Sequence, residues 1–240
     1  MTSYVVTPPR SPSVAVAGEA ARFPVHRIYC VGRNYSDHVR EMGGDPGREP
    51  PIFFSKPPDA VLADGAPLPY PDRTANFHHE VELVVAIGAA GRHVAPARAL
   101  DLVYGYAVGN DYTRRDLQVF AKERGRPWDI AKGFDQSAGI NAIVPVARSG
   151  HPRRGQIWLT VNGSERQRSD IDQLIWDVPD VIAELSAYFA LLPGDLIYTG
   201  TPAGVGAVVP GDLVVAGIDG LGTLTNRIVA SDVTAGGESG

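Results

Sequence analysis

The stretch HHEVELVVAIG (residues 78–88) decides the fold, because it combines an apolar strand pattern with two closely spaced carboxylates. Side chains alternate between the two faces of a strand, so Glu80 and Glu82 share one face. The opposite face is apolar and consists of Val81, Leu83, Val85 and Ile87. The segment therefore predicts a strand that carries two like charges on one side.

A third carboxylate, Asp111, ends another strand-like segment, YGYAVGND (104–111). Unpaired buried carboxylates cost on the order of several kcal/mol each, so something cationic is expected beside them. No matching pair of Lys or Arg occurs in the same segment. A hard divalent metal is the economical answer, and ligation by oxygen alone favours Mg²⁺, Mn²⁺ or Ca²⁺ over Zn²⁺. The alternative is a solvated strand face with two exposed glutamates.

Working outward from these strands, the sequence predicts an α+β fold built mainly from short strands. Pro and Gly punctuate the apolar runs at short intervals, which is typical of antiparallel or mixed sheets joined by turns. Two longer segments, 113–125 and 177–191, have helix-like patterns. We expect three parts, which are an N-terminal extension (1–25), a single catalytic domain (26–231) and a mobile tail (232–240).

Composition and charge argue against several classes of protein. The 240-residue chain is 44% hydrophobic and 20% charged, with a net charge of −5, so we expect a globular protein with no nucleic-acid partner. The N-terminus lacks a signal-peptide pattern and no run is long enough to span a bilayer, so no membrane partner is expected. The lone Cys30 can form no internal disulfide, which is consistent with a reducing compartment and a cytoplasmic location.

A short helix expected after residue 34 carries His38 and Glu41, which lie three residues apart and so share one face. A carboxylate bonded to an imidazole fixes its tautomer and raises its basicity, as a general base that activates water requires. Asn34 or Ser36 could cap this helix. The segment GGDPG (43–47) could hinge it as a lid over the carboxylates. A His and a Glu at this spacing also occur on ordinary surface helices.

Lys132 lies among small and apolar residues and could bind a substrate oxygen as a point charge. It could instead be a surface Lys paired with Asp129 or Asp135. Arg115 and Gln118 share one face of the helix-like segment that follows the third carboxylate. They could reach the same pocket or could form a solvated face.

The loop TGTPAGVG (199–206), which contains Thr201, follows a strand and exposes backbone N–H groups that can bind an anionic oxygen. It is not a P-loop, because no Gly-Lys-Ser/Thr sequence follows. His78 and His79 precede the glutamates, but alternation places His79 on the opposite strand face and His78 at most at the edge of the pocket. We interpret both histidines as structural.

Together and in this order, these motifs resemble the fumarylacetoacetate hydrolase family, and most of all its short acylpyruvate and fumarylpyruvate hydrolase branch. The resemblance covers the chain from about residue 24 and rests on VGRNYSDHVREMG (31–43), SKP (55–57), NFHHEVELVVAIG (76–88), GYAVGNDYTRRDLQ (105–118), GRPWDIAKGFDQS (125–137), LTVNG (159–163) and IYTGTPAGVG (197–206). It implies a mixed β-roll with a lid helix, a homodimer, and a site for Mg²⁺ or Mn²⁺ with Ca²⁺ as a substitute.

The resemblance also implies roles for the residues singled out above. The family's functional positions are metal ligands, a water-activating dyad and substrate contacts, and they map in that order onto Glu80, Glu82 and Asp111, onto His38 and Glu41, and onto Lys132, Arg115, Gln118 and Thr201. Every one of these positions holds the expected type of residue.

Such a site would hydrolyse the C3–C4 bond of a 2,4-dioxo acid to pyruvate and a carboxylic acid, with Lys132 stabilising the pyruvate enolate. Fumarylpyruvate is the first choice, in aromatic catabolism of the gentisate type. Its second carboxylate would bind Arg33 or Arg115, unless these make structural ion pairs. Two alternatives stay open: decarboxylation or tautomerisation of oxaloacetate at the same site, and a metal-stabilised domain without catalysis.

Overall fold

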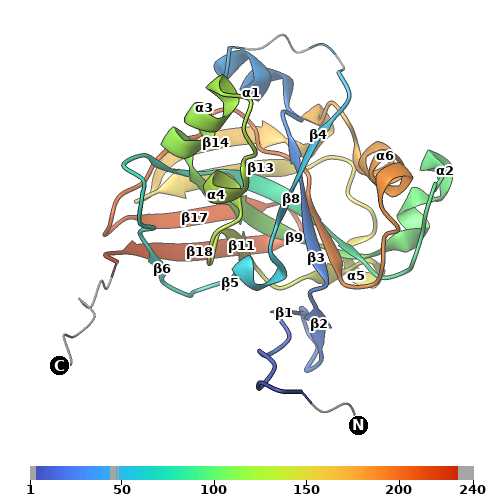
Figure 1. Ribbon diagram of the computed structural model, residues 1–240. Coiled ribbons are helices and arrows are strands. Elements are labelled where there is room, and N and C mark those ends of the chain that lie inside the picture. The colour runs from blue at the N-terminus through green and yellow to red at the C-terminus, as the bar shows by residue number, and fades with distance from the viewer. Residues whose placement is uncertain (1–3, 44–46, 48, 232–240) are drawn as a thin grey trace.

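The computed structural model describes residues 4–43, 47 and 49–231. Its centre is an eight-stranded mixed sheet in which the acidic strand β8 pairs antiparallel with β9 (Figure 1). The order is β4–β3–β15–β8–β9–β11–β5, and β12 pairs with β9 outside this path. The strands are Arg27–Gly32 (β3), Ile52–Lys56 (β4), Val61–Ala63 (β5), Val81–Ile87 (β8), Val103–Asp111 (β9), Ala138–Ile140 (β11), Val144–Pro145 (β12) and Asp195–Tyr198 (β15).

A five-stranded sheet packs against this central sheet, because β13 and β17 contact β8, and β17 and β18 contact β9. Its order is β14–β13–β17–β18–β6. The strands are Leu68–Pro69 (β6), Gln156–Val161 (β13), Ser164–Asp170 (β14), Leu213–Ile218 (β17) and Gly222–Val229 (β18). The two sheets and their few short helices form the expected mixed β-roll of the α+β class.

The remaining strands form two smaller sheets. Strand β1 (Ser13–Ala15) pairs with β2 (Arg22–Pro24), while β7 (Phe77–His79) lies between β10 (Thr113–Arg114) and β16 (Gly206–Ala207). This second sheet matters for the site, because it joins the segment before the glutamates to the segments that follow Asp111 and Thr201.

Short helices flank the sheets in two groups (Figure 1). Helices α1 (Ser36–Glu41), α3 (Arg115–Glu123) and α4 (Asp129–Lys132) lie at one end, and α2 (Pro96–Ala99) packs on α6 (Val178–Tyr188) at the other. The remaining helical turns are Pro58–Ala60 (η1), Leu100–Leu102 (η2), Val146–Ser149 (α5) and Ile171–Gln173 (η3). Within the described ranges, every helix is too short or too polar to cross a bilayer.

Local structure differs from the sequence-based expectation at the start of α1. The N-cap residue is Tyr35 and no side chain caps the helix. The Asn34 amide is engaged elsewhere, since it donates to the carbonyl oxygens of Trp176 and Thr199 and accepts from the Trp176 N–H. The expected capping role of Asn34 or Ser36 is therefore wrong, because tertiary hydrogen bonds hold Asn34 in place.

The pattern of apolar runs does not predict strand β14, because all of its side chains are polar. A turn signal was nevertheless present, because Asn162 and Gly163 lie between two strands and both have positive φ angles of 52° and 79°. Asn-Gly in this conformation is the strongest short-range signal for a β-hairpin. The apolar run NAIVPV (141–146) forms only the two-residue strand β12.

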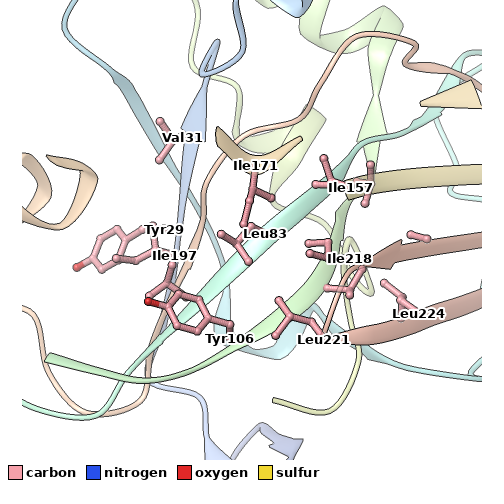
Figure 2. Packing of buried hydrophobic residues seen from close by; sticks show 14 of the residues in the cluster. Tyr29, Val31, Leu83, Tyr106, Ile157, Ile171, Ile197, Ile218, Leu221 and Leu224 are labelled. Atoms are coloured by element: carbon pink, nitrogen blue, oxygen red, sulfur yellow. The ribbon is translucent and has the colours of Figure 1, made fainter. Parts of the chain in front are cut away.

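The main core lies between the central sheet and the five-stranded sheet. Figure 2 shows Leu83, Tyr106 and Ile197 from the first sheet close to side chains of the second, such as Ile157 and Ile218. These side chains are buried. The apolar face predicted for strand β8 therefore forms part of the core, whereas Glu82 on its other face lines the site.

A second cluster covers the other side of the central sheet and includes Val14 and Phe23 from the β1–β2 hairpin together with Cys30. Part of the expected N-terminal extension is thus packed into the core, and Cys30 is a buried free thiol. The division at residue 25 stays a prediction, and the expected mobile tail lies outside the described residues.

Candidate active site

The three carboxylates come together because β8 and β9 pair antiparallel, and the start of β8 lies beside the end of β9. Val81 lies opposite Asn110, and the Asp111 N–H donates to the Glu80 carbonyl oxygen at 2.8 Å. This pairing places Asp111 beside the acidic strand, and carboxylate oxygens of Glu80, Glu82 and Asp111 lie within 4.8 Å of one another. All three side chains are buried, so the alternative of a solvated strand face is wrong.

Glu80 and Asp111 are paired with cations that come from distant segments. The Lys132 ammonium group donates to Glu80 at 2.8 Å, to Asp111 at 2.6 Å and to the Thr113 hydroxyl at 2.7 Å. Lys132 is only 2% exposed, so its interpretation as a surface residue is wrong. Burial alone would lower its pKa, but Asp111 and Glu80 outweigh burial and raise the pKa, so Lys132 is charged.

Lys56, at the end of β4, is a member of the site that the sequence analysis did not identify. Its ammonium group lies 2.7 Å from an Asp111 oxygen and also donates to the carbonyl oxygens of Tyr112 and Lys132. The sequence contained a pattern that could have identified Lys56, because side chains alternate along β4 and therefore Phe54 and Lys56 share one face of the strand. Both residues lie close to Lys132, whose ammonium group lies 5.1 Å from the centre of the Phe54 ring.

Glu82 differs from the other two carboxylates, because no cationic side chain of the described residues forms an ion pair with it. Among the described residues, its hydrogen-bond donor is the Gly200 N–H, which donates to Oε2 at 2.7 Å. Gly200 has a φ of 103°, and a Cβ there would lie 2.7 Å from the Asn34 side chain, so only glycine fits this turn. Burial first, and then the Asp111 and Glu80 charges, raise the pKa of Glu82 well above its usual range.

Glu80 has the opposite electrostatic environment. Burial would raise its pKa, but the charges of Lys132 and Arg115 outweigh burial and lower the pKa below its usual range. The Arg115 guanidinium donates both to Glu80 and to the Gln118 side-chain oxygen. Arg115 and Gln118 thus share a helix face and line the pocket, as expected, and Arg115 makes a structural ion pair with a predicted ligand.

The dyad is formed as predicted, because the His38 Nδ1 atom lies 3.0 Å from the Glu41 carboxylate on α1. His38 is 7% exposed and lines the same pocket as the three carboxylates. The other Glu41 oxygen accepts from the Gly204 N–H at 3.0 Å. The loop at 199–206 therefore binds anionic oxygens, as predicted, and the oxygens belong to Glu82 and Glu41. The proposed hinge residues 44–46 lie outside the described residues.

The two histidines before the glutamates have structural contacts. His79 is fully buried and bonds to Gln167 at 2.9 Å. His78 bonds to Asn76 at 2.8 Å and lies 3.3 Å from the Arg115 guanidinium. Burial, followed by the Arg115 charge, lowers the pKa of His78 to about 4. Both histidines lie outside the carboxylate cluster.

The three carboxylates, His38, Lys132, Arg115 and Gln118 line one cleft. Of the predicted site residues, only Glu41 is absent from its lining, and its carboxylate contacts His38, which lines the cleft. Six further residues line it that the sequence analysis did not assign to the site, namely Val31, Gly32, Met42, Phe54, Lys122 and Trp128. Thr201 also lines it, with its hydroxyl bonded to the buried Gln167 at 2.8 Å.

Comparison with known proteins agrees with this geometry. Residues 27–229 match the family model described as "Fumarylacetoacetate (FAA) hydrolase C-terminal". A fumarylpyruvate hydrolase from Ralstonia sp. is 46% identical over 75% of this chain and 94% of its own length. The human mitochondrial protein named oxaloacetate tautomerase FAHD1 is 43% identical over 84% of this chain and 90% of its own length.

Solved structures are similar over nearly the whole chain. The crystal structure of fumarylpyruvate hydrolase from Pseudomonas aeruginosa, in complex with Mn²⁺ and pyruvate, has a TM-score of 0.94 and is 52% identical. The match covers 95% of this chain and 100% of that one.

Proposed function

Because the chain belongs to the fumarylacetoacetate hydrolase family, we propose that it is a metal-dependent enzyme that hydrolyses the C3–C4 bond of 2,4-dioxo acids, with fumarylpyruvate as its substrate. The observation that carries this proposal is that one cleft holds both the carboxylate cluster and His38. The relatives named fumarylpyruvate hydrolase support the choice of substrate.

The donor set fits a hard divalent ion, since Glu80, Glu82 and Asp111 offer only oxygen ligands. Of the three carboxylates, Glu82 most requires a bound cation. It is 1% exposed and, among the described residues, lacks a cationic side-chain partner. Mg²⁺ or Mn²⁺ bound here would polarise the substrate's oxygens and stabilise developing negative charge.

The dyad provides the base. With a proton on Nδ1, His38 donates to Glu41 and leaves Nε2 free to accept a proton from water. The resulting hydroxide adds to the C4 carbonyl carbon. When the C3–C4 bond breaks, its electron pair stays on C3, and the proton held by His38 returns to C3. The products are pyruvate and a carboxylic acid, which is fumarate for fumarylpyruvate.

Lys132 is proposed to stabilise the negative charge on the leaving pyruvate unit. Its ammonium group is buried beside Asp111 and Glu80, and a fixed charge in a water-poor site stabilises a developing anion more strongly than water does. Its bonds to two proposed ligands also hold the carboxylates of Glu80 and Asp111 beside the same ammonium group.

The test measures loss of 2,4-dioxo acid absorbance and release of pyruvate with fumarylpyruvate and Mn²⁺. We expect His38→Gln to lower kcat by roughly 10²- to 10⁴-fold, the contribution of a general base, while Mn²⁺ affinity is retained. Asp37→Asn is the matched control, because Asp37 lies on the same helix with its side chain 82% exposed. Full activity of His38→Gln would exclude the proposed base.

Oxaloacetate tautomerisation is a second candidate, favoured by the relative named oxaloacetate tautomerase. It moves a proton without attack by water, so it would change oxaloacetate absorbance without releasing pyruvate or CO₂. Decarboxylation would release both products. Inactivity on both fumarylpyruvate and oxaloacetate, with Mg²⁺ and with Mn²⁺, would support the alternative of a metal-stabilised domain without catalysis. The homodimer, the cytoplasmic location and the part in aromatic catabolism stay predictions from the sequence.

A further inference from the structure

Two cationic side chains of the cleft, Arg33 and Lys122, have no partner in the described part of the chain. Both line the cleft and are half-buried. The other two cations that line it are engaged, because Lys132 binds Glu80 and Asp111, and Arg115 binds Glu80. Arg33 and Lys122 therefore place positive charge in the cleft that no described side chain neutralises.

The two charges act on one another. Burial first, and then the charges of Arg33 and Arg115, lower the pKa of Lys122. Because like charges repel most strongly where water is partly excluded, this arrangement is unfavourable in the empty cleft. A bound anion would remove the repulsion.

The backbone holds Arg33 in an unusual conformation, with a φ of 60°. Residues other than glycine rarely adopt this left-handed region, and doing so costs on the order of 1 kcal/mol or more. The next residue, Asn34, fixes the segment through bonds to Trp176 and Thr199. The fold thus stabilises a strained backbone that keeps Arg33 at the cleft.

The exposed fractions of the lining side chains distinguish the floor of the cleft from its mouth. The carboxylates and Lys132 are at most 4% exposed and form the floor, whereas Arg33 and Lys122 are half-buried and lie nearer to solvent. The lining also includes apolar surface, which is supplied by Val31, Met42, Phe54 and Trp128. A linear substrate held at the floor by its pyruvate end would lay its carbon chain on this surface and bring its far end toward the mouth.

We propose that Lys122 and Arg33 together bind a carboxylate at the far end of the acyl group, so that the enzyme prefers 2,4-dioxo acids with a second carboxylate. This assignment rests on the proposed function. Arg115 is no longer a candidate for binding this second carboxylate, because its guanidinium is occupied by Glu80 and Gln118. Lys122 takes its place as a specificity-determining residue.

The experiment compares kcat/KM for fumarylpyruvate and for crotonylpyruvate, which has a methyl group in place of the distal carboxylate. We expect Lys122→Gln and Arg33→Gln each to lower the fumarylpyruvate to crotonylpyruvate ratio by about 10- to 100-fold, the effect of losing a hydrogen bond to a charged group. Lys122→Arg, which keeps the charge, should retain most of the preference. Thermal unfolding of each variant confirms that it is folded.

Arg124→Gln is the matched control, because it removes a positive charge just beyond α3 from a side chain that packs on Phe120 outside the cleft. It should leave the ratio unchanged. Wild-type cleavage of both substrates with a ratio that neither Lys122→Gln nor Arg33→Gln alters would overturn the subsite and leave the proposed function standing. Cleavage of neither substrate with Mn²⁺ would overturn the proposed function, and the subsite with it.

Discussion

At the scale of single residues, Glu82 shows why three similar carboxylates are not equivalent. Glu80 and Asp111 each contact a buried ammonium or guanidinium group, whereas Glu82 accepts only the Gly200 N–H among the described residues. Two neighbouring negative charges act on it. Its charge is therefore unfavourable in the metal-free protein and favourable beside a divalent ion.

This contrast predicts that substitution of Glu82 stabilises the metal-free protein but weakens the binding of Mn²⁺. Glu82→Gln should raise the melting temperature of the metal-free protein, because it removes a buried, uncompensated charge. It should lower Mn²⁺ affinity by at least about tenfold, since a charged ligand is lost, and so reduce the stabilisation by Mn²⁺. Thermal unfolding with EDTA and with Mn²⁺ measures both effects. An undiminished Mn²⁺-dependent shift in the variant would show that Glu82 is not a ligand.

At the scale of elements, Gln167 on β14 joins three segments of the site. Its side chain accepts from the Val81 N–H at 3.1 Å and donates to Thr201 and to the Pro202 carbonyl oxygen, each at 2.8 Å. It also bonds to His79. One buried amide thereby fixes the start of the acidic strand relative to the loop that follows β15.

Gln167→Leu should lower the free energy of unfolding by about 2–3 kcal/mol, because buried donors and acceptors are left without partners. It should also raise KM, since Thr201 loses its anchor. Urea denaturation and steady-state kinetics measure these changes. Arg168→Gln on the same strand is the control, because Arg168 is exposed and its substitution should leave both quantities unchanged. Equal stability of Gln167→Leu and wild type would contradict the role of Gln167.

Asp116 in the first turn of α3 makes stability depend on pH. It accepts from the Thr74 hydroxyl at 2.6 Å and from the N–H groups of Ala75 and Leu117 at 2.8 and 2.9 Å. Burial alone would raise its pKa, but these bonds outweigh burial and lower it. A lowered pKa stabilises the fold above the unfolded value of about 3.9, and this stabilisation is lost as the pH falls through the folded pKa.

Asp116→Asn should therefore lower the free energy of unfolding at pH 7 and have a smaller effect in acid. Urea denaturation of both proteins at about pH 7 and at about pH 3 measures the difference, since the unfolded carboxyl group titrates between these values. A difference that is the same at both pH values would mean that the ionised carboxylate of Asp116 contributes nothing specific.

At the scale of the whole molecule, the central sheet is buried on both faces. The five-stranded sheet covers one face, while the β1–β2 hairpin contributes to the cluster on the other. Phe23 of the hairpin is 7% exposed and its ring lies 5.5 Å from that of Tyr104. Cys30 lies in the same cluster and is completely buried, and burial raises the pKa of its thiol.

We expect Phe23→Ala to lower the free energy of unfolding by about 3 kcal/mol, as is usual for deletion of a buried aromatic side chain. It should also increase the rate at which a thiol reagent labels Cys30 in native buffer. Tyr4→Ala is the control, because Tyr4 lies in the same N-terminal segment and is 68% exposed. Unchanged labelling together with unchanged stability would show that the hairpin is not an integral part of the core.

Features that depend on local periodicity were determined by the sequence itself. Alternation along one strand placed Glu80 and Glu82 on the same face, and helical spacing placed His38 beside Glu41. Both follow from backbone geometry over a few residues. The ordered series of motifs predicted the mixed β-roll through the resemblance to a family whose members share these residue types at the same spacing.

Only the tertiary structure decided which charges meet. Lys56 bonds to the Lys132 carbonyl oxygen across 76 positions in the sequence, and Gln167 bonds to Thr201 across 34. No local pattern encodes such pairings, because they depend on how the sheets curl and which strands become neighbours. The same long-range packing occupied Arg115 with Glu80 and left Arg33 and Lys122 without a described partner at the cleft.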